Sequence, residues 1–222
     1  MIIVAVANLK GGCGKSTIST SLAVRAVQDF DRVAILDLDP NAGAGQWYQL
    51  RLQRGYSQEP FVLTQSANVT SALEALRLDR RDLVIIDCGP NSTSLMRQAV
   101  EEAEIVIVPT KGAAQDFGST CDTIEICRDA EAPFLMVLNE TSPARAGIED
   151  QRTLGAIQIY EREAGPITWG QVLHRRAAFQ DAALLGLGVH ELASSDARSR
   201  GEIEKLYEQI IVTVAKARGV NV

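Results

Sequence analysis

The chain of 222 residues carries a net charge of −6 at pH 7, and 46% of its residues are hydrophobic. This length fits one large α/β domain, and the hydrophobic content is ordinary for a globular protein. The acidic balance excludes a protein that is basic all over, although a local basic face can still contact DNA. The sequence shows no signal peptide and no apolar run of about 18 residues, so we expect a soluble, cytoplasmic protein without a membrane span.

Strand-like and helix-like segments alternate along the chain. Short apolar, β-branched runs predict buried parallel strands, and the segments between them follow helical periodicity. The expected strands are 2–7, 32–38, 61–64, 83–86, 105–108, 133–138 and a short one near 166–168. The expected helices are 18–27, 44–52, 68–76, 94–103, 116–129, 148–163, 177–185 and 201–218. Ser66 is the expected cap of the helix at 68–76, and Pro109 is expected to stop the strand at 105–108.

This order of segments predicts the fold class. Strands that alternate with helices form right-handed crossovers, which build a parallel sheet. We therefore predict an α/β fold with a mostly parallel central sheet flanked by helices on both faces. Residues 1–222 are expected to form a single domain, because the sequence shows no internal repeat, low-complexity tract or linker.

Residues 8–17, Asn-Leu-Lys-Gly-Gly-Cys-Gly-Lys-Ser-Thr, form a glycine-rich turn between the first strand and the first helix. Backbone N–H groups of such a turn surround phosphate oxygens at the positive end of the helix. Lys15 is expected to reach the β- and γ-phosphates, and Ser16 to bind Mg²⁺. Lys10 is a second lysine that is better placed to reach a phosphate held by a facing subunit. The strict G-x-x-x-x-G-K-[ST] pattern fails because Leu9 replaces its first glycine.

Three aspartates stand at the ends of predicted strands. Asp37 and Asp39 follow the second strand, and Asp87 ends the apolar run 83–86. Ligands of open α/β sheets lie beyond the carboxyl ends of the strands. An apolar run that ends in Asp has the Walker B form, which places a carboxylate to hold Mg²⁺ directly or through its water.

The four cysteines show no C-x-x-C pair and no Cys/His cluster with zinc spacing. They are Cys13, Cys88, Cys121 and Cys127. We expect them to be buried free thiols.

The K-G-G-x-G-K-[ST] form of residues 10–16 resembles the deviant Walker A motif of the ParA/MinD family. Residues 37–41 resemble its D-x-D-P-Q segment with Asn41 in place of Gln, and 87–90 resemble the end of its third switch segment. Residues 108–110 with 116–117 resemble the stretch that lines its dimer face. Residues 137–139 resemble the strand whose last residue, here Asn139, contacts adenine. These matches span residues 1 to about 140 in order, and the tail at 179–182 and 188–191 is similar more loosely. They point to the small members that lack an N-terminal helix-turn-helix extension.

The resemblance implies an ATPase that uses ATP and Mg²⁺, with ATP joining two subunits into a sandwich dimer. Asp39 would orient the attacking water and Asp37 would support Mg²⁺, while Lys10 would act across the dimer as an arginine finger does. The implied catalytic residues are Lys10, Lys15 and Asp39. The implied ATP-binding residues are Lys10, Gly11, Gly12, Cys13, Gly14, Lys15, Ser16, Thr17 and Asn139. The implied metal-binding residues are Ser16, Asp37 and Asp87.

Three functions are compatible with this resemblance. The first is a ParA-type partition or positioning ATPase, nucleoid-associated, whose ATP-bound homodimer binds DNA non-specifically and moves a DNA or protein cargo. A ParB-like or other adaptor protein would then stimulate hydrolysis. The second is a MinD-like membrane ATPase, which needs an amphipathic C-terminal helix with large apolar residues. The third is a relative of the nitrogenase iron protein, whose cluster cysteines have glycine-rich surroundings.

We favour the first function. Residues 215–222 are short and contain no aromatic residue or Leu, and Cys88 and Cys121 lack glycine-rich surroundings of that kind. No membrane partner is therefore expected. Non-specific DNA binding needs only a cluster of cations. The candidate DNA-binding residues on the C-terminal third are Arg175, Arg176, Arg198 and Arg200, with Lys205 nearby.

Overall fold

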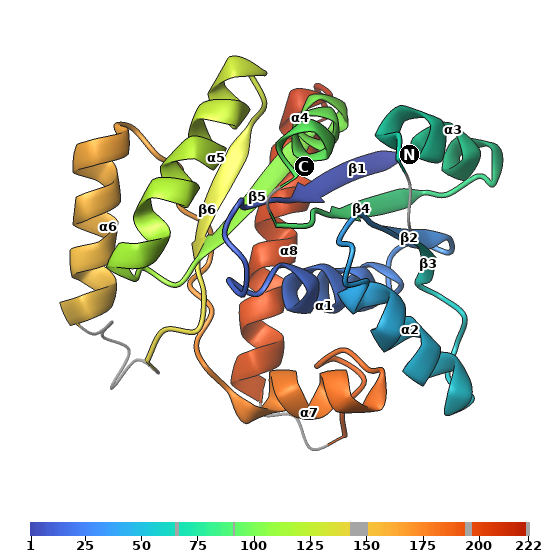
Figure 1. The fold of residues 1–222 in the computed structure, drawn as a ribbon. Coiled ribbons are helices and arrows are strands. Elements are labelled where there is room, and N and C mark those ends of the chain that lie inside the picture. Colours follow the sequence, from blue (N-terminus) through green and yellow to red (C-terminus); the bar gives the residue numbers. More distant parts are fainter. Residues whose placement is uncertain (65–66, 91, 143–150, 194–196, 221–222) are drawn as a thin grey trace.

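The computed structural model describes residues 1–64, 67–90, 92–142, 151–193 and 197–220. A six-stranded sheet forms the centre, with the strand order β3-β2-β4-β1-β5-β6 and parallel pairing throughout (Figure 1). The strands are β1 (Ile2–Val6), β2 (Val33–Asp37), β3 (Phe61–Thr64), β4 (Leu83–Asp87), β5 (Ile105–Thr110) and β6 (Phe134–Leu138). The strands β2, β4 and β5 are buried along their whole length, as their runs of Val and Ile predict.

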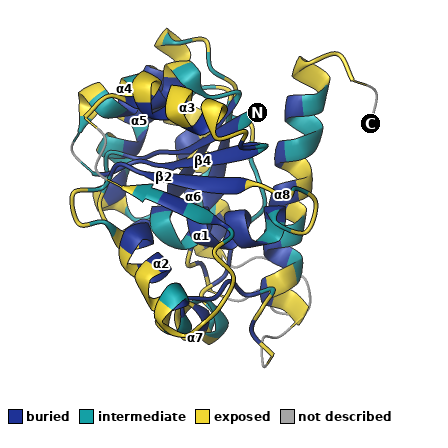
Figure 2. Ribbon diagram, turned by 90° about the vertical axis from the view of Figure 1, so that its right-hand side faces the viewer, coloured by how far each residue is buried: buried dark blue, intermediate teal, exposed yellow. Residues whose placement is uncertain are grey.

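Helices cover both faces of the sheet (Figure 2). One core lies between the sheet and α1 (Lys15–Ala26), α2 (Gly43–Gln53), α7 (Ala177–Leu185) and α8 (Ala197–Ala217). The other core lies under α3 (Val69–Leu78), α4 (Thr93–Glu102), α5 (Phe117–Asp129) and α6 (Gln151–Ala164). A 3₁₀ turn, η1 (Ala114–Asp116), leads into α5. The predicted α/β fold is confirmed. No helix among the described residues combines the length and apolar character needed to cross a membrane.

The predicted stop of the fifth strand at Pro109 is wrong, because β5 continues through Pro109 and pairs it with Val137 of β6. On its other side, the pairing of β5 with β1 ends at Ile107. The carbonyl of Pro109 faces Asn8 beyond the end of β1 and accepts a hydrogen bond from Asn8 Nδ2 at 2.8 Å. The missing N–H of Pro109 therefore falls where no ladder hydrogen bond is lost.

The cap of α3 is Asn68, whose side chain accepts a hydrogen bond from Ser71 N at 2.8 Å. Asn is among the residues most favoured at this position. The predicted cap, Ser66, lies outside the described residues, as do the first residues of the helix predicted at 148–163.

The short strand expected near 166–168 is replaced by isolated bridges in the described part of the chain. Met136 N donates to the carbonyl of Thr168 at 2.9 Å, and Gly170 N donates to the carbonyl of Met136 at 2.8 Å. A second bridge pairs Thr141 with His174. These contacts cover the outer edge of β6, which would otherwise expose unpaired backbone groups.

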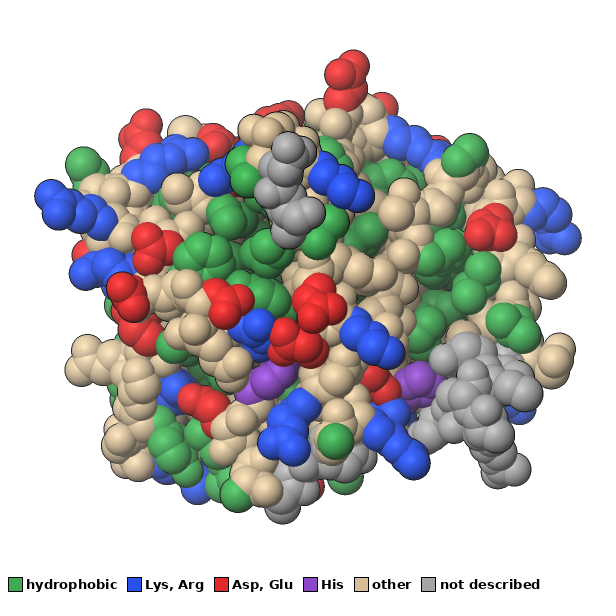
Figure 3. Space-filling view, turned by 180° about the vertical axis from the view of Figure 1, so that it is seen from behind, with side chains coloured by type: hydrophobic (Ala, Val, Ile, Leu, Met, Phe, Trp, Pro, Cys, Tyr) green, Lys and Arg blue, Asp and Glu red, His purple; other side chains and the backbone are tan. Residues whose placement is uncertain are grey.

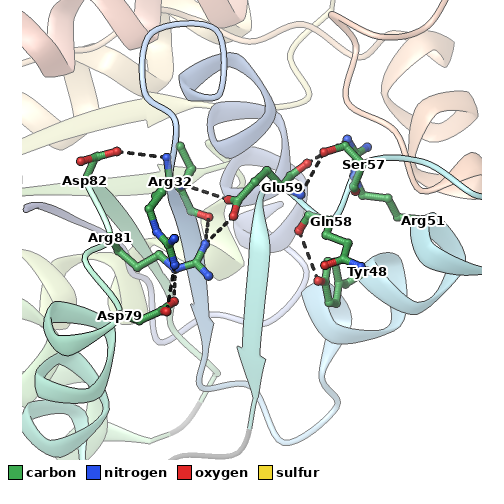
Figure 4. Close-up of polar contacts among 10 residues, drawn as sticks. Arg32, Tyr48, Arg51, Ser57, Gln58, Glu59, Asp79, Arg81 and Asp82 are labelled. Carbon is green, nitrogen blue, oxygen red and sulfur yellow. Dashed lines mark hydrogen bonds and ion pairs between the residues drawn. The ribbon is translucent and has the colours of Figure 1, made fainter.

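A charged network joins the amino ends of β2, β3 and β4 (Figure 4). Arg81 donates to Glu59 Oε1 and Asp79 Oδ2, both at 2.7 Å, and to the carbonyl of Val33 at 3.2 Å. Arg32 extends the network to Asp79 Oδ1 at 2.8 Å. Because a buried guanidinium is costly unless it is paired, this network fixes how the three strands start.

Candidate nucleotide site

The glycine-rich loop joins β1 to α1 and forms one side of a cleft of about 280 Å³. Gly12 and Gly14 have φ of +73° and +96°, a region that glycine adopts readily. The helix α1 then begins at Lys15 with no side-chain cap and no acidic residue in its first turn. Its first N–H groups are therefore available to an anion. The cleft is lined by Gly11, Gly12, Gly14, Lys15, Ser16, Thr17, Asp39, Pro90 and Glu140.

The two lysines of the loop lie in different surroundings. Lys15 is 6% exposed, and its Nζ donates to the carbonyl of Lys10 at 2.8 Å. The side chain of Lys10 is 36% exposed and its Nζ lies 3.5 Å from Asp116 Oδ1 in η1. Lys15 is thus buried beside the cleft, whereas Lys10 lies at the surface and is held by an acidic partner of its own chain.

The carboxylate of Asp37 is buried and organises the loop after β2. Its Oδ1 accepts from Asp39 N at 3.0 Å and its Oδ2 accepts from Gly45 N at 2.9 Å. Burial raises the pKa of Asp37 above its ordinary value. Asp39 lines the cleft, and its Oδ1 accepts from the backbone and side-chain amides of Asn41. A Cβ at Gly45 would lie 2.7 Å from Thr64 Cγ2, so the start of α2 approaches β3 closely.

The carboxylate of Asp87 lies beside that of Asp37, because β2 and β4 pair these two residues directly. Asp87 Oδ1 accepts from Ser19 Oγ at 3.1 Å, whereas Asp87 Oδ2 is buried and has no hydrogen-bond partner among the described residues. Burial raises the pKa of Asp87 to about 7. Oxygen ligands with one unpaired carboxylate oxygen fit Mg²⁺, which binds few protein groups and keeps several waters. Ser19 was missed from sequence, although it lies one helical turn after Ser16 on α1.

A second cavity of about 160 Å³ adjoins the loop. Asn139, the predicted adenine contact, lines this cavity, and its Nδ2 donates to the carbonyl of Cys13 at 2.8 Å. A Cβ at Gly14 would overlap Asn139 Nδ2, so glycine is required there by space as well as by conformation. The other lining residues are Thr17, Ile18, Glu140, Leu173, His174, Arg175, Arg176, Phe179, Gln180 and Ala183.

The predicted DNA-binding arginines differ in their exposure and in their ion pairs. Arg176 Nε donates to Glu202 Oε1 at 3.0 Å, and Glu202 is a buried residue of α8 that also accepts from His174 N and Nδ1. Arg175, Arg198 and Arg200 are exposed. On the rear face, basic side chains alternate with acidic ones around the two histidines and form no continuous basic stripe in the part of the chain drawn (Figure 3).

All four cysteines are free thiols. Cys13, Cys88 and Cys127 are buried, and Cys121 is half-buried, so the predicted burial is confirmed for three of them. Burial raises the pKa of the Cys127 thiol to about 12 and that of Cys88 further. Across the described ranges, no group of three His, Cys, Asp or Glu side chains is arranged to hold a metal ion.

Residues 4–209 match the family of CobQ/CobB/MinD/ParA nucleotide binding domains. The chain belongs to this family. ParA/MinD members of this family are ATPases, so the chain is an ATPase. The resemblance to the ParA/MinD family is thereby confirmed.

Three related proteins match this chain over nearly their whole length. The chain is 29% identical over 213 residues to "Maintenance of carboxysome distribution protein A" of Halothiobacillus neapolitanus, covering 93% of this chain and 95% of that protein. It is 26% identical to "Chromosome-partitioning ATPase Soj" of Thermus thermophilus, covering 96% and 97%. Among solved structures, that of apo McdA of Cyanothece has the same fold, with a TM-score of 0.72 at 17% identity, covering 96% of this chain and 99% of that one.

Proposed function

We propose that this ATPase is a ParA-type positioning protein whose ATP-bound homodimer binds DNA without sequence preference. The observation that carries the proposal is the second loop lysine. The side chain of Lys10 is partly exposed and paired with Asp116, whereas Lys15 is buried. A cation in that position can leave Asp116 for a phosphate held by a facing protomer. It would stabilise transition-state charge there, a contribution worth about 10³–10⁵ in rate for arginine fingers.

The residues around the cleft divide the remaining work. Ser16 and Asp87 would hold Mg²⁺, which neutralises charge on the β- and γ-phosphates when it is bound. Lys15 compensates phosphate charge within its own protomer. Asp39, which lines the cleft, would orient the attacking water. Asp37 would act indirectly by positioning the loop, because its two oxygens already accept hydrogen bonds from the backbone of Asp39 and from the start of α2.

The proposed cargo is a protein assembly or a DNA molecule carried on the nucleoid. The relatives named for carboxysome distribution and chromosome partitioning support a positioning role. A partner protein would release the dimer by stimulating hydrolysis. We propose a cytoplasmic, nucleoid-associated protein acting as one domain over residues 1–222.

Replacing Lys10 tests the central claim. Lys10→Ala should bind ADP like the wild type, because Lys15 and the loop N–H groups remain. It should lose the ATP-dependent dimer or its hydrolysis. Size-exclusion chromatography with ATP and Mg²⁺ against ADP, together with phosphate release, measures both. Loss of ADP affinity in Lys10→Ala would assign Lys10 to its own loop and contradict the proposal.

A retention assay on duplex DNA tests the DNA-binding part. DNA of any sequence should be retained with ATP and Mg²⁺ and not with ADP, and salt should weaken retention steeply. Arg198→Glu with Arg200→Glu should abolish retention while sparing the dimer, because both arginines are exposed and neither lines the cleft or the adjoining cavity. Arg162→Glu on α6, also an exposed arginine, is the matched control. Retention on anionic liposomes but not on DNA would replace this function by the MinD-like one.

A further inference from the structure

A closed ring of polar contacts holds Lys10. Asn8 Oδ1 accepts from the backbone N–H of Lys10 at 2.8 Å, and Asn8 Nδ2 donates to Thr120 Oγ1 at 3.0 Å. Thr120 Oγ1 donates to the backbone carbonyl of Asp116 at 2.8 Å. The ion pair between Asp116 Oδ1 and Lys10 Nζ, at 3.5 Å, closes the ring. One side-chain amide therefore connects to both ends of Lys10, directly to its backbone and through Asp116 to its ammonium group.

The ring is anchored in the core. Asn8 and Thr120 are both 0% exposed, and Asn8 Nδ2 donates a second hydrogen bond to the carbonyl of Pro109 at 2.8 Å. The partners of Asn8 are 101 and 112 residues away in sequence, on β5 and α5. A buried polar group that is left without a hydrogen-bond partner lowers the stability of the folded protein. Such a network therefore has one favoured arrangement, in which every group is paired. The backbone of Lys10 is thus held rigidly although its side chain reaches the surface.

We infer that Asn8 and Thr120 are positioning residues for Lys10 in ATP hydrolysis. This inference rests on the proposed action of Lys10 across the dimer. A lysine loses rotamer freedom whenever its ammonium group enters a defined site. A fixed backbone leaves only the side chain to be ordered. Thr120 contributes twice, because it holds both Asn8 and the residue that pairs with Lys10 in the single protomer.

Removing the Thr120 hydroxyl tests the inference. Thr120→Val should lower kcat for ATP by about 10- to 100-fold, the range expected from a small misplacement of a catalytic group. The dissociation constant of a fluorescent ADP should stay unchanged, because Thr120 does not line the cleft. Thr120→Ser keeps the hydroxyl and should restore kcat. Tyr207→Phe is the matched control, since it removes a buried hydroxyl that has no hydrogen-bond partner in the described structure. The melting temperature of each variant is measured so that kcat is compared well below unfolding.

A double variant separates positioning from a merely structural role. If Thr120 acts through Lys10, Thr120→Val should cause no further loss in the Lys10→Ala background, either in turnover or in the fraction of ATP-bound dimer. An undiminished further loss there, or wild-type kcat in Thr120→Val itself, overturns the inference. With Lys10→Ala slow and Thr120→Val normal, this inference alone fails. Wild-type turnover in Lys10→Ala would overturn the proposed role of Lys10 first, and the inference with it.

Discussion

The two ends of the parallel sheet each hold a buried ionisable side chain, and the two side chains differ in how fully they are paired. At the amino end, Arg81 is 9% exposed and its guanidinium meets Glu59, Asp79 and the carbonyl of Val33 (Figure 4). At the carboxyl end, Asp87 is fully buried, and within the part of the chain that the structure describes its Oδ2 has no hydrogen-bond partner. Paired charges at one end hold strands together, whereas a charge short of partners at the other end indicates where a ligand completes the set.

The largest expected effect is at the carboxyl end. Lys15→Ala should weaken ADP binding by about 100-fold, because a charge-assisted contact to phosphate and the order of the loop are both lost. Isothermal titration calorimetry measures the dissociation constant. Lys216→Ala, an exposed lysine of α8, is the control and should bind like the wild type. An unchanged constant in Lys15→Ala would move the phosphate site away from this cleft.

Asp39→Ala should separate binding from hydrolysis. We expect turnover to fall by about 100-fold, since orienting a water contributes on this scale. ATP binding should persist, because Asp39 contributes little to holding phosphate, and the variant should accumulate as an ATP-bound dimer. Size-exclusion chromatography with ATP against ADP checks this, with Asp31→Ala as a surface control. A monomer in both nucleotides, with Mg²⁺ present, would contradict the dimer switch.

The unpaired carboxylate should make the nucleotide-free protein sensitive to pH. Because burial raises the pKa of Asp87 to about 7, the folded state holds its proton more tightly than the unfolded state does. The free energy of unfolding should therefore decrease as pH rises from about 4 to 7. Between pH 5 and pH 8 in EDTA, the melting temperature of Asp87→Asn should fall by about 5 °C less than that of the wild type. Equal losses in the two proteins would refute this account of Asp87.

The smallest effect on nucleotide binding is expected at the amino end. Arg81→Met should lower the melting temperature by about 5 °C, since it removes the guanidinium from the half-buried Glu59 and from the carbonyl of the buried Val33. The dissociation constant for ADP should remain that of the wild type in the folded fraction. Thermal unfolding with and without ADP measures both quantities. A clear loss of ADP affinity would show that the two ends of the sheet are coupled, and would contradict a purely structural role for the charged network at the amino end.

The features that could be predicted from sequence are those whose residues lie close together along the chain. Lys15, Ser16 and Asp87 belong to short motifs next to apolar strands. The alternation of strands and helices likewise predicted the parallel sheet. Contacts between distant segments left no such pattern. Ser19 meets Asp87 across 68 residues, so no spacing rule connects them.

The wrong strand end at Pro109 and the unforeseen ion pair of Arg176 have the same origin. Pro109 carries a strong local signal against a strand, and the structure tolerates it only because β1 ends beside it. Arg176 has the sequence appearance of a surface cation, yet Glu202 holds it from a helix that begins twenty-one residues later along the chain. Contact between Arg176 and DNA stays a prediction.

The unequal burial of the four thiols provides a natural reporter. Cys121 is the only half-buried one and lies on α5 directly after Thr120, while the other three are buried in the core. Burial raises the pKa of Cys121, so this thiol should react with a maleimide more slowly than a fully exposed thiol but faster than the three buried thiols. A dye attached at Cys121 would sit within two turns of Asp116. Its emission could then follow the departure of Lys10 in real time, without any engineered cysteine.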